Sequence, residues 1–293
     1  MEIRIGTRAS KLALAQAEMV RDRLAGEYPQ HRFCIKTVKT EGDRELEKPL
    51  NQMGGKGVFV REIEERLLSG TIDIAVHSMK DLPVNLPKGL IYTKAWKRED
   101  ARDALVLREK KSLAKLPAGA VIGTGSARRE RQMARLRPDI RVVGIRGNID
   151  TRLEKMERQG LDGIILAAAG LNRLGMAGRI THCFSYEEMV PAPGQGILAL
   201  EIRRENTELC EMLDALSDEE SDFAARAERT FLSLCGGDCH VPAGAVCERT
   251  KDGRYRLRTV YGKGQKEELL LLEVTGEDPK EMAEQAAERM GLL

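Results

Sequence analysis

Apolar and polar positions recur with two different periods along residues 1–80, and these periods predict short strands joined by helices. A short strand is predicted at 2–6, an alternating pattern predicts a strand at 33–40, and a short apolar run predicts another at 72–76. Apolar residues at helical spacing predict helices at 9–27 and from about 60 to Gly70. This alternation of strand and helix is typical of βαβ units around a largely parallel sheet.

A second series of the same kind follows a charged break, KREDARD, at residues 97–103. The predicted strands lie at 120–123, 140–145 and 163–167, and the predicted helices at 126–136 and 148–159. The turn-rich stretch VPAPGQG at 190–196 is a candidate hinge, and a strand predicted at 198–202 is expected to return to the first sheet. The fold class is therefore α/β, with two sheets that are expected to be largely parallel.

The C-terminal part has a different pattern, in which strands follow one another. Ser217 and Glu220 have the spacing of a capping box before a helix that runs to about Leu234. Strand-like runs at 244–248, 255–261 and 269–274 and a closing helix at 279–290 come next. Consecutive strands with helices outside them predict a small α+β domain.

Composition narrows the class of protein. A chain of 293 residues with 42% hydrophobic and 32% charged residues is expected to form more than one globular domain. We find no apolar run that suits a signal peptide or a membrane span, so the expected compartment is the cytoplasm, where six cysteines stay reduced. A net charge of +2 and 4% aromatic residues argue against nucleic-acid and membrane partners.

Arginines recur where predicted strands lead into helices. The six positions are Arg8, Arg128, Arg129, Arg146, Arg152 and Arg173. A cation at a helix N-terminus opposes the helix dipole at a cost of about 0.3–1 kcal/mol, whereas the free N–H groups there attract anions. A solvated basic face would explain one such pair, but not its repetition in several turns. Because α/β folds bind ligands at the carboxyl ends of strands, we expect these side chains to bind a polyanion in a cleft between two domains.

The anion is better explained as a polycarboxylate than as a nucleotide. Neither a complete P-loop nor a complete dinucleotide fingerprint occurs, although GGKG at 54–57 and GTGSAR at 123–128 are fragments of such loops. The planar guanidinium group donates two parallel hydrogen bonds to a carboxylate, which suits arginine to this class of ligand.

An acidic residue follows the buried strand at 72–76. In HSMKD, Asp81 either caps a turn or provides a carboxylate that stabilises positive charge in the cleft. Ser78 and Lys80 can add donors to the anion site. His77 is interpreted as a packed, hydrogen-bonded histidine with no assigned function.

The stretch SLCGGDCHVPAG at 233–244 holds Cys239 between an acid and an imidazole. Zinc would need about four ligands at recognisable spacings, which are missing here, and no metal site is predicted. A disulfide does not suit the expected compartment, and a cysteine nucleophile would require a histidine partner. An inert thiol and a thiol that carries a covalent group both remain open.

Long motifs in this chain resemble the porphobilinogen deaminase family, in the same order. They are GTRASKLALAQA, GGKGVFVREIE, DIAVHSMKDLP, GTGSARR, RGNIDTRL, ILAAAGLNRLG, PAPGQG and AERTFLSLCGGDCHVPAG. The resemblance runs from near residue 4 to near residue 245, and HSMKDLP is its most specific part.

The resemblance implies an α/β fold with two lobes like those of periplasmic binding proteins, each with a doubly wound mixed sheet, and a small α+β C-terminal domain. The expected boundaries are 1–96 with 193–213 for the first domain, 97–192 for the second and 214–293 for the third. It also implies a monomeric transferase of haem biosynthesis that condenses four porphobilinogen molecules, loses ammonia at each addition and releases hydroxymethylbilane. The alternative is a non-catalytic, two-lobed polycarboxylate-binding module, which would not explain Asp81 together with the loop cysteine.

The resemblance assigns roles to residues. Cys239 matches the cysteine that holds a dipyrromethane cofactor through a thioether, and Asp81 matches the catalytic carboxylate. The residues that match cofactor- and substrate-binding positions are Arg8, Ser10, Gln16, Lys56, Ser78, Lys80, Thr124, Ser126, Arg128, Arg129, Arg146, Arg152, Arg173 and Gln195. Lys56 lies in a stretch that resembles the family's mobile loop. Asp238 departs from the family, which usually has a glycine before the cysteine, and this replacement changes the charge and backbone freedom of the loop.

Overall fold

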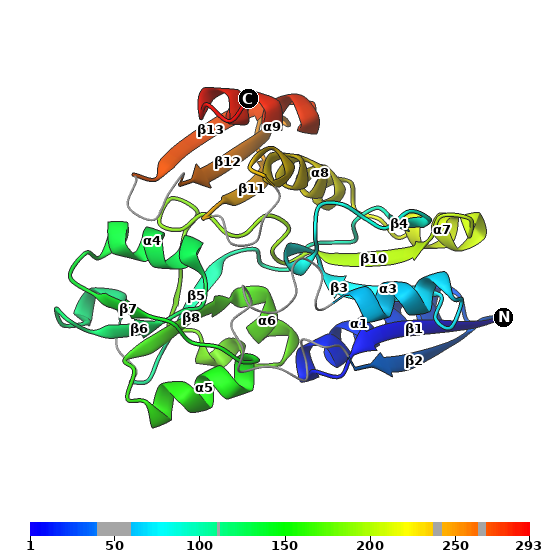
Figure 1. Ribbon diagram of the computed structural model, residues 1–293, viewed down its shortest axis with the longest axis horizontal. Coiled ribbons are helices and arrows are strands. Elements are labelled where there is room, and N and C mark those ends of the chain that lie inside the picture. Colours follow the sequence, from blue (N-terminus) through cyan, green and yellow to red (C-terminus); the bar gives the residue numbers. More distant parts are fainter. Residues whose placement is uncertain (40–59, 110–111, 237–241, 263–267) are drawn as a thin grey trace. The chain divides into compact units, whose positions relative to one another are not determined.

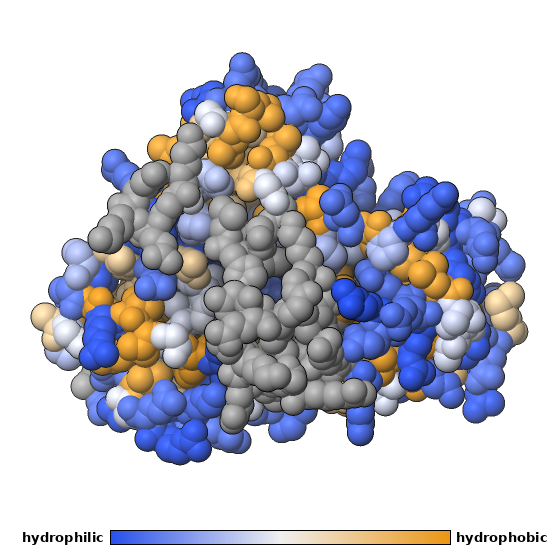
Figure 2. Space-filling model, in the orientation of Figure 1, coloured by the Kyte–Doolittle hydropathy of each residue, from blue (hydrophilic) through white to orange (hydrophobic). Residues whose placement is uncertain are grey.

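The computed structural model describes residues 1–39, 60–109, 112–236, 242–262 and 268–293 (Figure 1). Two compact units can be distinguished: Met1–Arg98 with Ile197–Asp222, and Glu99–Gly196 with Phe223–Leu293. In the view of Figure 2, hydrophilic residues cover much of the described surface. Within the described ranges, we find no helix with the length and apolar character needed to cross a bilayer. Lys56 and Cys239 lie outside the described residues, and the division into three domains stays a prediction.

The first unit is built on a mixed five-stranded sheet in the order β2-β1-β3-β10-β4. The strands are β1 (Glu2–Arg8), β2 (Arg32–Val38), β3 (Ile74–Ser78), β4 (Leu90–Tyr92) and β10 (Leu198–Arg203). β1 pairs in parallel with β2 and β3, whereas β10 runs antiparallel to β3 and β4. The prediction that the strand after the turn-rich stretch returns to the first sheet is therefore confirmed.

Helices cover both faces of this sheet. They are α1 (Lys11–Glu27), α3 (Arg61–Leu68) and α7 (Thr207–Asp214). On one face, Ile74 and Val76 of β3 pack in a cluster with Val20 and Leu24 of α1. On the other face, Ala75 packs with residues of α3. Because neighbouring side chains on a strand point to opposite faces, β3 presents residues 74, 76 and 78 to α1 and residues 75 and 77 to α3.

The second unit has a mixed sheet in the order β7-β6-β8-β5-β9. Its strands are β5 (Asp103–Leu107), β6 (Val121–Gly123), β7 (Arg141–Val143), β8 (Gly163–Ala167) and β9 (His182–Cys183). Its helices are α4 (Ala127–Leu136), α5 (Ile149–Arg158) and α6 (Ala168–Arg173). The fold class predicted from the sequence, α/β with two doubly wound mixed sheets, is confirmed. The strands β4, β5 and β9 were not predicted from the sequence.

A three-stranded antiparallel sheet completes this unit, as the α+β prediction expected. It consists of β11 (Gly244–Arg249), β12 (Tyr255–Tyr261) and β13 (Leu270–Gly276), with α8 (Glu219–Leu234) and α9 (Pro279–Arg289). The predicted capping residue was wrong: Asp218, rather than Ser217, accepts a hydrogen bond from the backbone N–H of Ser221 at 2.9 Å. A carboxylate at the N-cap also interacts favourably with the helix dipole.

Hydrogen bonds within the second unit hold the turn-rich stretch at 190–196, the candidate hinge. The C=O of Val190 accepts from Arg128 at 2.6 Å and from Gln132 at 2.9 Å. The buried carboxylate of Glu228 on α8 accepts from the N–H of Gly194 at 2.6 Å and from the N–H of Cys247 at 2.8 Å. This carboxylate therefore fastens the stretch and β11 to one helix.

We expect Glu228→Ala to lower the free energy of unfolding by about 2–6 kcal/mol, because two buried N–H groups lose their acceptor and each costs about 1–3 kcal/mol. Chemical denaturation followed by circular dichroism measures this change. Ser233→Ala, at an exposed position of the same helix, is the control and should change stability by less than about 0.5 kcal/mol. Equal stability of the two variants would contradict the anchoring role.

Candidate functional site

A pocket in the first unit lies at the carboxyl ends of β1 and β3. Five residues predicted from the sequence line it: Arg8, Ser10, Gln16, Ser78 and Asp81. They come from the end of β1, the start of α1, the end of β3 and the short 3-10 helix η2 (Met79–Asp81). The structure thus gathers side chains that are up to 73 positions apart in the chain.

Local hydrogen bonds fix the inner part of this pocket. The hydroxyl of Ser10 caps α1 by accepting from the N–H of Ala13 at 3.3 Å. The buried Gln16 donates from Nε2 to the hydroxyl of Ser78 at 2.9 Å, which links α1 to the end of β3. These bonds orient polar groups towards one place at the end of the sheet.

Asp81 is the acidic member of this set. It is exposed and follows Met79, whose side chain is buried and whose N–H donates to the C=O of Ile197 at 3.0 Å. A buried neighbour therefore anchors the turn that carries the carboxylate. Lys80 lies in the same turn and is half-buried. The cations Arg8 and Lys80, the carboxylate of Asp81 and several neutral polar groups suit a ligand that has both acidic groups and a positive charge.

In the second unit, a buried carboxylate binds the two arginines at the start of α4. Asp103 is completely buried, and its oxygens accept from Arg128 at 2.6 Å and from Arg129 at 2.9 Å. Gln195 donates to the same carboxylate at 2.9 Å. Burial alone would raise the pKa of Asp103, but the two guanidinium groups outweigh it and hold that pKa well below its usual range.

This ion pair gives Arg128 and Arg129 an anionic partner within the chain. Cations at the start of α4 were expected to require an anion, and Asp103 is an anion supplied by the chain itself. The side chain is 25 positions from Arg128 and stands at the end of the charged break, so no local pattern reveals it. The binding roles of Arg128, Arg129 and Gln195 stay predictions beside this observed structural role.

Two other predicted residues shape the start of α4. The hydroxyl of Thr124 accepts from the N–H of Ser126 at 3.3 Å. The hydroxyl of Ser126 caps the helix by accepting from the N–H of Arg129 at 3.5 Å. Their proximity to the helix N-terminus is consistent with an anion site, since N–H groups converge there.

The other arginines of this unit have different environments. Arg146 is exposed in the loop before α5, and Arg152 is half-buried in that helix. Arg173 ends α6 and donates from Nη2 to the C=O of Gly196 at 2.6 Å, while its buried Nε has no hydrogen-bond partner among the described residues. Burial lowers the pKa of Arg173 to about 10, although Glu99 acts in the opposite direction. This buried guanidinium N–H can therefore donate a hydrogen bond to a carboxylate of a ligand.

The described cysteines are all free thiols: Cys34, Cys183, Cys210, Cys235 and Cys247. Burial raises the pKa of Cys235 to about 12, so its reactive thiolate is rare at neutral pH. This disfavours Cys235 as an attachment site for a covalent group. In the part of the chain that is described, we find no group of three or more His, Cys, Asp or Glu side chains that could hold a metal ion.

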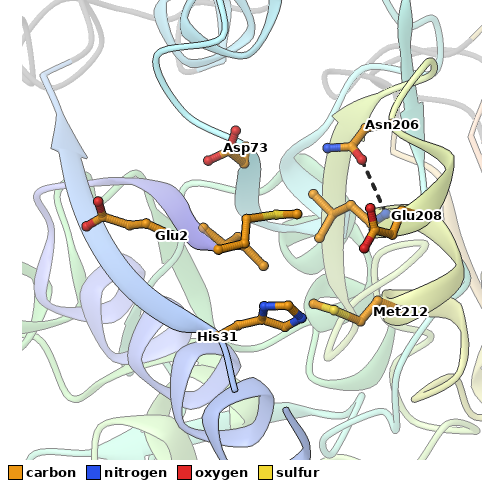
Figure 3. Close-up of a pocket in the computed structure, with 9 residues that line it drawn as sticks. Glu2, His31, Asp73, Asn206, Glu208 and Met212 are labelled. Atoms are coloured by element: carbon orange, nitrogen blue, oxygen red, sulfur yellow. Dashed lines mark hydrogen bonds between the residues drawn. The ribbon is translucent and has the colours of Figure 1, made fainter. Parts of the chain in front are cut away.

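Another pocket of the first unit lies at the opposite, amino end of β1 (Figure 3). Three acidic residues and one histidine are among the residues that line it: Glu2, Asp73, Glu208 and His31. Asp73 is already paired there with Arg4 at 2.8 Å and with Arg203 at 3.3 Å. None of the residues predicted for the functional site lines this pocket, and we regard the pocket at the carboxyl ends of the strands as the candidate site.

Comparisons with known proteins identify the family to which the sequence is similar. The family model described as "Porphobilinogen deaminase, dipyromethane cofactor binding domain" matches residues 3–211. A porphobilinogen deaminase of Lachnospira eligens is 52% identical over 294 residues and covers 100% of both chains. One from Alkaliphilus metalliredigens is 52% identical over 243 residues, which are 83% of this chain and 77% of that protein. The Bordetella pertussis BvgS periplasmic VFT2 domain is a similar solved structure, with a TM-score of 0.42, 16% identity and coverage of 73% and 86%.

Asp103→Asn is expected to destabilise the second unit by about 3–5 kcal/mol at pH 7, because it leaves buried cations beside a neutral amide. Since the pKa of Asp103 is depressed, its stabilising contribution is present above the ordinary carboxyl pKa of about 4 and is lost as the pH falls. The difference from the parent protein should therefore shrink below about pH 4. Thermal unfolding at several pH values measures it.

The control is Asp139→Asn, which breaks an exposed ion pair with Arg137. Exposed pairs contribute little, so this variant should stay close to the parent protein at neutral pH. A destabilisation by Asp103→Asn no larger than that of the control would rule out the buried pair as a major contributor to stability.

Proposed function

Because the chain belongs to the porphobilinogen deaminase family, we propose that it condenses four porphobilinogen molecules head to tail, with loss of ammonia at each addition. The product, hydroxymethylbilane, is released by hydrolysis, and a dipyrromethane primer stays bound. The protein is thus a transferase of tetrapyrrole biosynthesis. The single observation that carries this assignment is the match to the family over residues 3–211, joined by full-length identity of 52% to a curated relative.

The donors of the first unit fit the acidic side chains of a pyrrole. Porphobilinogen carries an acetate and a propionate, and the candidate pocket offers the guanidinium of Arg8 with the polar groups of Ser10, Gln16 and Ser78. A guanidinium group can bind a carboxylate through two parallel hydrogen bonds. We assign these residues, with Lys80 beside them, to carboxylate binding and orientation.

Asp81 has the chemistry that loss of ammonia requires. Positive charge develops on the substrate as the amino group leaves, and a carboxylate at the pocket stabilises that charge. Its exposed position also allows protons to exchange with solvent. We therefore assign Asp81 as the catalytic residue.

When bound, the dipyrromethane would supply the carbon nucleophile for the first new ring, and each later ring would join the free end of the growing chain. The carboxylates of the dipyrromethane fit the donor set of the second unit, where the buried Nε of Arg173 has no hydrogen-bond partner among the described residues. The other residues assigned to this role are Thr124, Ser126, Arg128, Arg129, Arg146, Arg152 and Gln195. Lys56 is assigned to the same function from the family resemblance.

Cys239 is assigned as the point of attachment. The alternative, Cys235, is buried, and its raised pKa makes it a poor nucleophile. The helix α8 ends at Leu234, and Gly236 has φ +91, a left-handed conformation that commonly ends a helix.

The protein is further proposed to act as a cytoplasmic monomer without nucleic-acid or membrane partners. Its net charge of +2 gives no general attraction to polyanions, which leaves recognition of carboxylates to local arginines. The proposed three-domain division, 1–96 with 193–213, 97–192 and 214–293, assigns the cofactor-bearing loop to the third domain.

Asp81→Asn should reduce the rate of porphobilinogen consumption on the order of 10²- to 10⁴-fold, because the carboxylate charge is removed while the shape is kept. The thermal midpoint and the covalent cofactor mass should be unchanged. Asp22→Asn, an exposed position on α1, is the control and should be as active as the parent protein. A normal rate for Asp81→Asn would remove this residue from the mechanism.

Intact-protein mass spectrometry under denaturing conditions tests the attachment. We expect additional mass equal to two linked pyrrole units, located on the peptide that contains Cys239. Cys239→Ser should lose this mass and the activity, while Cys235→Ser should keep both. A bare polypeptide mass from freshly prepared, active protein would contradict covalent attachment.

A further inference from the structure

The guanidinium of Arg173 lies close to an acid that the proposed function does not use, Glu99. Both residues are half-buried in the second unit. Glu99 and Gly196 are the two ends of one continuous stretch of this unit, and the fold brings these ends together. Arg173 stands in the last turn of α6, which follows β8 directly, and its side chain reaches the same place.

One backbone oxygen, that of Gly196, joins the acid and the cation. It accepts a hydrogen bond from the N–H of Glu99 at 3.2 Å and another from Nη2 of Arg173 at 2.6 Å. The backbone of Glu99 and the guanidinium of Arg173 are therefore bound to the same atom. At this separation, a glutamate side chain can bring its carboxylate to the guanidinium by changing its rotamer.

The carboxylate of Glu99 nevertheless binds elsewhere. Its Oε1 accepts from Nδ2 of Asn172 at 3.0 Å and from the N–H of Asp100 at 2.9 Å. In the described part of the chain we find no ion pair between Glu99 and Arg173, and the buried Nε of Arg173 has no hydrogen-bond partner there. Asn172 thus binds the acid that lies nearest to the cation beside it in the chain.

This separation of the two charges has an electrostatic consequence. Burial lowers the pKa of Arg173 to about 10, and the negative charge of Glu99 acts in the opposite direction. Glu99 therefore supports the charge of the guanidinium without using its N–H groups. A carboxylate in direct contact would instead accept two parallel hydrogen bonds, from the same donors that a ligand carboxylate needs.

We propose that Asn172 is a positioning residue: by binding the carboxylate of Glu99 it keeps this acid away from Arg173, whose guanidinium then binds a carboxylate of the bound pyrroles. This inference rests on the proposed function, since it requires the carboxylate-binding role assigned to Arg173. An amide suits the task because it donates a hydrogen bond to the acid and adds no charge that would compete with the ligand.

The test removes the donor of Asn172 and makes two measurements on the protein as isolated. One is KM and kcat for porphobilinogen, and the other is the fraction of protein with the covalent cofactor mass, from intact-protein mass spectrometry. In Asn172→Ala the released acid should pair with Arg173 and compete with the ligand. A competing ion pair should raise KM on the order of tenfold with a smaller change in kcat, if the ligand is the incoming substrate. If the ligand is the primer, the cofactor-bearing fraction should fall instead.

Removing the acid as well should rescue the variant. In Asn172→Ala/Glu99→Gln the competing charge is gone, so the affected quantity should return to within about threefold of the parent value. Glu99→Gln alone should stay near the parent, because glutamine still accepts a hydrogen bond from Asn172. The matched control is Asn172→Ala/Glu157→Gln, which removes an exposed acid of α5 and should show no rescue.

The rescue separates positioning from a structural contact. If Asn172 only stabilises the fold, the thermal midpoint and ligand binding should fall together, and a second substitution at the same contact should restore neither. Asn172→Leu, which nearly keeps the volume and also removes the donor, replaces the alanine variant if that protein does not fold.

An unchanged KM together with an unchanged cofactor-bearing fraction in Asn172→Ala would overturn the inference and leave the proposed function intact. A loss that Glu99→Gln does not restore, or that Glu157→Gln restores equally, would also overturn it. If the parent protein neither consumes porphobilinogen nor carries the cofactor mass, the proposed function fails, and the inference fails with it.

Discussion

The buried pairing of Asp103 with Arg128 and Arg129 is the constraint on which the second unit depends. A carboxylate without exposed surface is tolerated only when it is fully paired, and here two guanidinium groups and Gln195 pair it. The same contacts connect β5, the start of α4 and the stretch before β10. The position of the helix N-terminus is therefore fixed by charge as well as by packing.

Both units follow one rule for placing polar groups. Each has a mixed sheet with helices on it, and each gathers hydroxyl, amide and guanidinium groups where strands end and helices begin. Such positions offer free backbone N–H groups that attract anions without a large net charge. A nearly neutral protein can thus hold a polycarboxylate and avoid general attraction to other polyanions.

Buried acids in this protein differ in how completely they are satisfied. Each carboxylate oxygen of Glu228 accepts a hydrogen bond from one backbone N–H, that of Gly194 or that of Cys247. Glu228 thereby holds these two segments against α8. Glu201 has one oxygen bound to His77 and one without a hydrogen-bond partner among the described residues. The first arrangement is explained by stability alone. In the second arrangement, the buried oxygen without a partner costs about 1–3 kcal/mol.

The sequence by itself determined the α/β class, the small C-terminal α+β part and most of the helices, because these depend on local periodicity and capping. Its motifs also indicated the family and the polar residues that the pocket brings together. Only the tertiary structure revealed Asp103 as partner of the arginines, Glu201 as partner of His77 and Asp218 as the cap of α8. The two partnerships join residues 25 and 124 positions apart, so they depend on strand pairing and helix packing, which no local pattern records.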